Sequence, residues 1–160
     1  QDMTTEKDAA FKEIVEKELY CFHERFDKWE DSILACTKPL IEKKVIDQRY
    51  VDKIFESIDK YGPYIVLAPD VAMPHSTENC AGVFGTEIGF MRVKNPVHFV
   101  DGNPDKDARI FFTLASVDSN EHLNQMIQLA TLLADKEFVQ ACIEANTKED
   151  LLEIAEKFES

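Results

Sequence analysis

Long hydrophobic runs and closely spaced cysteines are both absent from this sequence of 160 residues. The longest apolar stretches, such as 110–115, are far shorter than the ~20 residues that a membrane-spanning helix requires. The four cysteines are too widely spaced for a CxxC pair or a zinc-ligand cluster, and four in a chain of this length do not suggest a disulfide framework. We therefore expect a cytoplasmic protein that holds no metal and no cofactor.

Basic residues are scarce. There are 18 Lys and Arg against 31 Asp and Glu, which gives a formal net charge of −13. Proteins that bind nucleic acid need clustered basic side chains to release counterions, so nucleic acid is excluded as an expected partner. Residues 4–18 also lack the basic start and the small-residue cleavage site of a secretion signal. An acidic surface would attract a basic protein partner, although simple solubility explains the charge equally well.

Glycine is also scarce, with five in the chain, and no repeat or Gly/Ser linker interrupts it. We expect one domain over residues 1–160, with 1–20 as an N-terminal extension. Helical patterns at 10–18, 27–41 and 47–61 precede four predicted strands at 64–68, 86–93, 96–100 and 109–117. Residues 19–25 fit either the end of a helix or a strand. More helices follow from 118, and the fold class is therefore α/β, a mixed β-sheet flanked by helices on both faces.

Capping residues mark where several helices should begin. Asp27 with Glu30, and Asp118 with Glu121, have the spacing of a capping pair, and Asp47 precedes another helix. The helix after Asp118 should bury one apolar stripe against the sheet. That stripe consists of Leu123, Met126, Ile127, Ala130 and Leu133.

The segment 62–76 carries the most chemical information, because it places His75 directly after Pro74 and a few residues beyond a predicted strand. Proline fixes its own φ and restricts the residue before it, so the approach to His75 is stiff. Near neutral pH, an imidazole offers a nitrogen lone pair without a separate base, which suits phosphoryl relay. A Pro-His pair alone, however, fits an ordinary loop histidine just as well.

The whole segment resembles the phosphorylation site of the mannitol/fructose-type enzyme IIA family of the bacterial sugar phosphotransferase system, especially its ascorbate-type branch. The family pattern reads approximately G-P-Y-I-V-[IL]-A-P-G-[IV]-A-[ML]-P-H-[AS]-R, and this chain agrees with it throughout 62–69 and 72–75. The resemblance extends over about residues 26–158. It implies that His75 is phosphorylated through Nε2, with Pro74 and Ser76 as supporting residues.

A second match covers 114–123 and is similar to the family's L-A-A-x-D-x-x-x-H-[LI] segment. By this resemblance, His122 is a second active-site histidine that orients or stabilises the phosphoryl group, and Asp118 supports it. His122 should also lie in the first turn of a helix, where free amides and the helix dipole favour an anion.

The resemblance also implies partners. The phosphoryl donor would be HPr and the acceptor a cysteine of an enzyme IIB, while the membrane component, enzyme IIC, would be reached only indirectly. The substrate taken up would be ascorbate or a pentitol-like sugar. The alternative is a regulatory IIA-like sensor that binds a regulator rather than feeding a transporter. The sequence leaves the oligomeric state open, and a homodimer is among the states it allows.

Three departures from the family pattern concern charge. Asp70 replaces a glycine and adds a negative charge, and Thr77 stands where an arginine often follows the histidine. Asp59 occupies the place of an arginine that mannitol-type members carry. These changes leave open which group compensates the charge of a bound phosphoryl group, and they motivate the regulatory alternative.

Other candidate residues have simpler interpretations. His98 alternates with apolar residues in a predicted strand, which favours a surface cross-strand role, and His23 with Cys21 supplies too few ligands for a metal. Cys80 fits a plain thiol better than a redox group. Several aromatic residues near these segments fit a core better than a sugar-binding platform; they are Tyr61, Tyr64, Phe84, Phe90 and Phe99.

Overall fold

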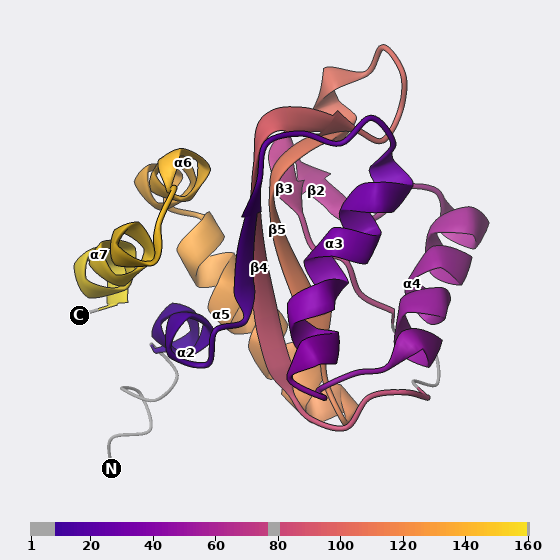
Figure 1. Cartoon of the computed structure of the whole chain (residues 1–160), viewed down its shortest axis with the longest axis horizontal. Coiled ribbons are helices and arrows are strands. Elements are labelled where there is room, and N and C mark those ends of the chain that lie inside the picture. Colours follow the sequence, from indigo (N-terminus) through magenta and orange to yellow (C-terminus); the bar gives the residue numbers. More distant parts are fainter. Residues whose placement is uncertain (1–8, 77–80, 160) are drawn as a thin grey trace.

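A five-stranded mixed β-sheet lies between two layers of helices in the computed structural model, which describes residues 9–76 and 81–159 (Figure 1). Helices α3 and α4 cover one face, and α2, α5, α6 and α7 lie on the other. The predicted α/β fold with helices on both faces is confirmed. The elements are α2 (Ala10–Glu16), β1 (Tyr20–His23), α3 (Trp29–Glu42), α4 (Gln48–Tyr61), β2 (Val66–Ala68), β3 (Asp70–Ala72), β4 (Glu87–His98), η1 (Pro104–Lys106), β5 (Asp107–Ala115), α5 (Ser119–Leu133), α6 (Lys136–Glu144) and α7 (Lys148–Glu159).

The strand order is β1-β4-β5-β3-β2. The two long central strands, β4 and β5, are antiparallel, while β3 runs parallel to β5 and β1 runs parallel to β4. Every side chain from Ile110 to Ala115 is buried, as predicted for a strand covered on both faces. Because β3 and β5 are neighbouring parallel strands, their carboxyl ends lie side by side at the same end of the sheet. This places the segment after β3, which contains His75, beside the start of α5.

Several strand boundaries differ from the prediction. The strands expected at 86–93 and 96–100 are one strand, β4, whose register with β5 shifts between Arg92 and Val97. Pro96 lies in that irregular stretch, where its missing N–H removes no regular ladder hydrogen bond. The strand expected at 64–68 is shorter, and the three-residue strand β3, which Pro69 separates from β2, was not predicted. The ambiguous segment 19–25 contains β1.

Helix starts follow the capping residues with one exception. The side chains of Asp47, Asp118 and Asp135 each accept a hydrogen bond from a backbone N–H two or three residues further on, at 2.8–3.0 Å. The prediction for Asp27 is wrong, because α3 begins two residues later and has no side-chain cap. The carboxylate of Asp27 instead accepts a hydrogen bond from the guanidinium of Arg25.

The apolar stripe predicted on α5 faces the core only in part, because Met126 and Leu133 pack against it while Leu123, Ile127 and Ala130 are exposed. Leu123 is 57% exposed and Ile127 is 56% exposed, whereas Gln125 and Leu129 are buried. Gln125 is tolerated there because its amide donates to two main-chain oxygens, at the start of β4 and the end of β5, at 3.1 and 2.9 Å. The N-terminal half of α5 therefore presents large apolar side chains to solvent.

The aromatic group expected in the core is divided. Phe90 and Phe99 are buried, but Tyr61 and Phe84 are exposed and Tyr64 is half-buried. No helix within the described ranges is both long enough and apolar enough to cross a membrane.

Candidate active site

The main chain around His75 continues the sheet beyond the end of β3. The carbonyl oxygen of Pro74 accepts a hydrogen bond from the backbone N–H of Leu114 in β5, at 3.0 Å. Residues 71–76 are all buried. Pro74 therefore lies in a fixed segment, and His75 is held next to the point where β5 ends.

The imidazole of His75 is 8% exposed, and one of its nitrogens has a hydrogen-bond partner. Nδ1 lies 2.6 Å from the carbonyl oxygen of Met73. A carbonyl can only accept, so Nδ1 must carry the proton, and in the neutral ring Nε2 then holds the free lone pair. Within residues 9–76 and 81–159, no side chain or main-chain group hydrogen-bonds to Nε2.

His122 lies beside His75 although the two belong to different elements. His122 is in the first turn of α5, and its ring centroid is 5.4 Å from that of His75, with 34° between the ring planes. Its side chain is half-buried. The two histidines that the sequence identifies as candidates therefore lie together, at the end of the sheet where β3 and β5 finish.

Both histidines have a pKa below the ordinary value for imidazole. Burial lowers the pKa of His75, the hydrogen bond to Met73 opposes that shift, and the neighbouring His122 lowers it further. Burial lowers the pKa of His122. Near neutral pH both rings are thus uncharged, and His75 offers its lone pair as a nucleophile.

Ser76 follows His75 and is 5% exposed. Its hydroxyl lies 3.1 Å from that of Ser57, and its backbone N–H donates to the hydroxyl of Tyr50 at 3.2 Å. Both partners are on α4. The sequence left Ser76 open between a phosphate donor and a turn-stabilising hydroxyl, and these contacts tie it to α4.

Tyr64 contacts His75 twice. Its hydroxyl donates to the carbonyl oxygen of His75, and its ring meets the imidazole edge-on, with 5.3 Å between centroids. Sequence patterns do not mark Tyr50 or Ser57 as parts of the site, and they favour a core position for Tyr64. The seven-residue spacing of Tyr50 and Ser57, which puts both on one face of a helix, was the available signal.

Other predicted residues are placed as follows. Asp118 acts as the cap of α5, accepting from the backbone N–H of Glu121, and so supports the turn that carries His122. Asp59 is exposed on α4, and Asp70 has a φ of 76°, in the left-handed region that favours glycine. Thr77 and Cys80 lie outside the described residues. Among the described residues, His122 is the one ionisable side chain that shifts the pKa of His75, because protonating one ring disfavours protonating the other.

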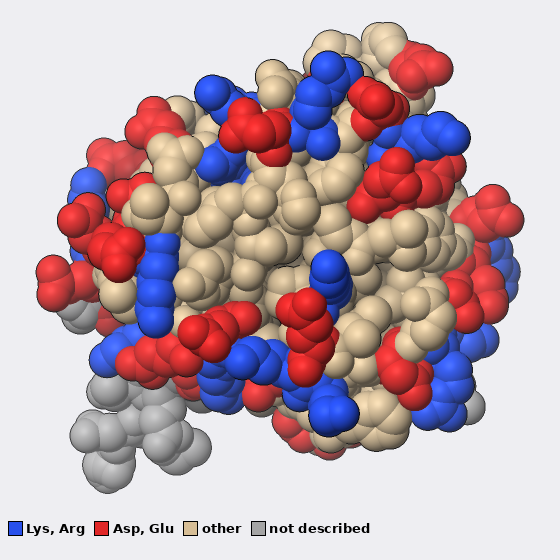
Figure 2. Space-filling model, in the orientation of Figure 1, with Lys and Arg blue, Asp and Glu red and all other residues tan. Residues whose placement is uncertain are grey.

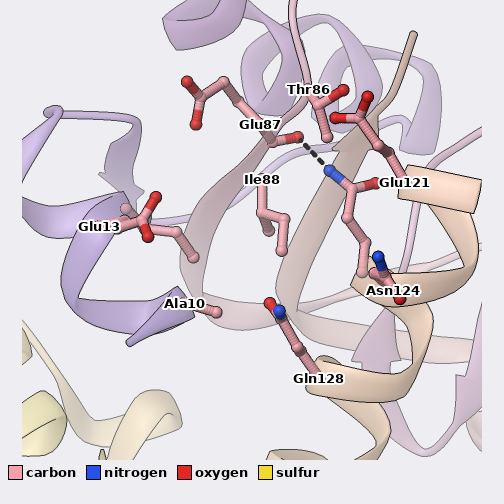
Figure 3. A pocket seen from close by; sticks show the side chains of 10 residues that line it. Ala10, Glu13, Thr86, Glu87, Ile88, Glu121, Asn124 and Gln128 are labelled. Atoms are coloured by element: carbon pink, nitrogen blue, oxygen red, sulfur yellow. Dashed lines mark hydrogen bonds between the residues drawn. The ribbon is translucent and has the colours of Figure 1, made fainter. Parts of the chain in front are cut away.

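A second concave region, between α2, β4 and α5, has a different character (Figure 3). Figure 3 shows the side chains of Glu13, Glu87 and Glu121 around it. Neither His75 nor His122 lines this pocket. Its carboxylates would repel a phosphoryl group, which leaves the histidine pair as the site suited to one.

His98 is exposed and pairs with Asp107 across the strands, as predicted, with 2.8 Å between Nδ1 and the carboxylate oxygen. No three His, Cys, Asp or Glu side chains in the described part of the chain are grouped so that they could hold a metal ion.

In the orientation of Figure 1, acidic and basic side chains are interspersed around a broad uncharged area (Figure 2).

Comparison with known proteins identifies relatives over most of the chain. Residues 13–158 match the family model described as phosphoenolpyruvate-dependent sugar phosphotransferase system, EIIA 2. An ascorbate-specific PTS system EIIA component from Mycoplasma pneumoniae is 29% identical over 136 residues, which are 84% of this chain and 84% of that protein.

Solved structures share the fold. The solution structure of the mannitol-specific cryptic phosphotransferase enzyme IIA from Escherichia coli superposes with a TM-score of 0.78 at 26% identity, over 92% of this chain and 99% of that one. A complex of the E. coli mannitol enzyme IIA with phosphorylated enzyme IIB superposes with a TM-score of 0.74 at 21% identity, over 88% and 95%. With the family model matching nearly the whole described chain, the protein belongs to the enzyme IIA family of the phosphoenolpyruvate-dependent sugar phosphotransferase system.

Proposed function

We propose that this protein is a cytoplasmic phosphoryl carrier that accepts a phosphoryl group from phospho-HPr on Nε2 of His75 and passes it to a cysteine of an enzyme IIB. The observation that carries the proposal is the hydrogen bond from Nδ1 of His75 to Met73, because it fixes the proton on one nitrogen and leaves the lone pair on the other. Family membership supports phosphoryl transfer as the reaction.

The transfer of the phosphoryl group from HPr to His75 needs no separate base. The Nε2 lone pair of His75 attacks phosphorus, an N–P bond forms, and the N–P bond to the donor histidine breaks with its electron pair returning to the HPr ring. The proton on Nδ1 stays where it is. Phosphoryl transfer has a loose transition state with charge spread over the oxygens, so positioning and charge stabilisation provide most of the catalysis.

His122 is suited to the phosphoryl oxygens rather than to nucleophilic attack. Its ring lies next to that of His75, and it is the more exposed of the two. It also lies in the first turn of α5, where the helix dipole favours negative charge. We infer that the donor approaches from the His122 side, because Met73 and Tyr64 cover other edges of the His75 ring.

Partner docking is supported by the apolar side chains that α5 exposes. Leu123 follows His122 directly, and Ile127 lies one turn further along the same helix. Ile127→Gln should raise the half-saturating concentration of phospho-HPr several-fold without changing the limiting transfer rate. The control is Leu34→Gln, which changes a 48% exposed leucine on α3, across the sheet from α5. Equal effects of the two substitutions would contradict this docking surface.

The test of the carrier function is incubation with phospho-HPr followed by intact-mass spectrometry. The wild-type protein and His98→Ala should each gain one phosphoryl group, and His75→Ala should gain none. His98 is a suitable control because it is an exposed histidine at a distant strand pair. Phosphorylation that persists in His75→Ala would refute the assignment.

A relay assay separates transport from regulation. An enzyme IIA of the same fold has been solved together with phosphorylated enzyme IIB, which makes an IIB the acceptor to test first. Transfer from phospho-His75 to the IIB cysteine would support the transport role, and a stable phosphoprotein would favour the regulatory alternative. The proposed substrate of the associated transporter is ascorbate or a pentitol-like sugar, because ascorbate-specific and mannitol-specific relatives are both 29% identical to this chain.

A further inference from the structure

The peptide between His75 and Ser76 is held by two tyrosine hydroxyls from outside the segment. Tyr64 donates to the carbonyl oxygen of His75, and Tyr50 accepts from the N–H of Ser76. We propose that these hydroxyls are positioning groups for the His75 nucleophile, because they fix the main chain of the residue that carries the imidazole. The proposal rests on the proposed function of His75 and adds residues that act through it.

Tyr50 connects the segment to the central strand. Its hydroxyl donates to the carbonyl oxygen of Leu114 at 2.6 Å and accepts from the N–H of Ser76 at 3.2 Å. A phenol has one proton to donate and lone pairs to accept, so both bonds are made at once. Tyr50 is 2% exposed, and its ring is locked in the core between α4 and the sheet. The residue after His75 is thereby tied to the end of β5.

Ser57 adds a second connection from α4. Its hydroxyl lies 3.1 Å from that of Ser76, and both residues are buried. Tyr50 and Ser57 are seven residues apart, two turns along one face of α4. Together they hold both the main chain and the side chain of Ser76 against a single rigid helix.

Tyr64 acts on His75 itself. The ring packs edge-on against the imidazole, with 78° between the planes, while the hydroxyl reaches the carbonyl oxygen of the same residue. Met73 holds Nδ1 of that imidazole. The ring nitrogen, the ring edge and the main-chain oxygen of His75 are thus each constrained by a different group.

Such constraint matters because phosphoryl transfer depends on placement. The attacking nitrogen must come within about 3–3.5 Å of phosphorus and in line with the breaking bond, and a misplacement of about 1 Å can cost about 100-fold in rate. A histidine on an untethered loop would sample many orientations between turnovers. The tyrosine hydroxyls restrict that sampling before the donor arrives.

The variants are Tyr64→Phe and Tyr50→Phe, which remove only the hydroxyl, with Tyr20→Phe as the matched control. Tyr20 lies on β1, an edge strand that β4 and β5 separate from β3. In rapid-quench transfer from phospho-HPr, the limiting rate should fall about tenfold or more for Tyr64→Phe and Tyr50→Phe, as expected for a displaced nucleophile. The half-saturating donor concentration should stay unchanged, and Tyr20→Phe should match the wild type.

A second readout uses the unphosphorylated protein. The ¹⁵N shifts of His75 should show the Nδ1–H tautomer in the wild type. Tyr64→Phe should show a mixture of tautomers, because the freed main chain of His75 no longer keeps Nδ1 aligned with the carbonyl oxygen of Met73. If Tyr50→Phe does not fold, because it leaves buried groups unpaired, Tyr64→Phe decides alone. Tyr64 is half-buried, so the loss of its hydroxyl is tolerated more easily.

The outcomes keep the two proposals apart. A limiting rate for Tyr64→Phe within twofold of the wild type, with an unchanged tautomer, would overturn the positioning role while leaving His75 as the acceptor. Absence of any phosphoryl group on wild-type His75 would overturn the carrier function instead. The tautomer measurement needs no phosphorylation and would still decide whether Tyr64 fixes the ring.

Discussion

Replacing Asp70 by glycine should stabilise the protein. Asp70 begins β3 with a φ of 76°, in a region that costs an L-residue about 1–2 kcal/mol and glycine almost nothing. Glycine also gains freedom in the unfolded chain, which costs about 0.4–1 kcal/mol. The difference between these two ranges is a net gain in the free energy of unfolding of about 0–1.6 kcal/mol, centred on about 0.8 kcal/mol. For a chain of this length, the central value raises the unfolding midpoint by about 2–3 °C.

The assay is thermal unfolding followed by circular dichroism, with Asp70→Asn measured alongside. Asparagine removes the charge but keeps a side chain at the positive φ, so its midpoint should stay close to that of the wild type. A rise in Asp70→Asn equal to that in Asp70→Gly would show that charge, not the backbone, is responsible. A midpoint of Asp70→Gly below the wild-type value would refute the reasoning altogether.

Three further predictions concern stability. Burial lowers the pKa of His75 and His122 in the folded state below the ordinary 6.5, so the free energy of unfolding should fall as the pH drops from about 7 through the folded pKa values. Denaturant titrations of the wild type and of His75→Gln/His122→Gln at about pH 7.5 and about pH 5 test this, since the double variant should lose less. Asp118→Ala removes the cap of α5 and should cost about 1 kcal/mol in urea unfolding, and no loss would contradict the capping role. Arg92→Met removes a buried guanidinium that donates to the carbonyl oxygen of Ala145 and the side chain of Asn146, at 2.8 and 2.7 Å. It should cost about 2 kcal/mol by the same measurement, and a change within about 0.5 kcal/mol would show that these bonds contribute little.

Local signals were enough to locate most elements and the two histidines. Capping at Asp47 and Asp118 depends on residues two or three positions away, so the sequence predicts these helix starts correctly. The motifs around His75 and His122 could also be recognised from the sequence, because each is a short continuous segment. What brings them together is the parallel pairing of β3 with β5.

The errors come from contacts between distant residues. Periodicity alone predicted that Leu123 and Ile127 are buried, but both are exposed. Gln125 is buried instead, because its amide donates hydrogen bonds to main-chain oxygens of two strands. No composition rule foresees this arrangement. The bond between Tyr50 and Ser76 could not be foreseen from the helical pattern at 47–61, because it depends on tertiary packing.

The direct test of the central claim is the position of phosphorus on the ring. After transfer from phospho-HPr, ³¹P and ¹⁵N NMR of the isotope-labelled protein should show one phosphohistidine, His75, with phosphorus on Nε2 and the proton on Nδ1. A phosphoryl group on Nδ1 of His75, or on His122, would contradict the account, because the hydrogen bond to Met73 would then not select the nucleophile.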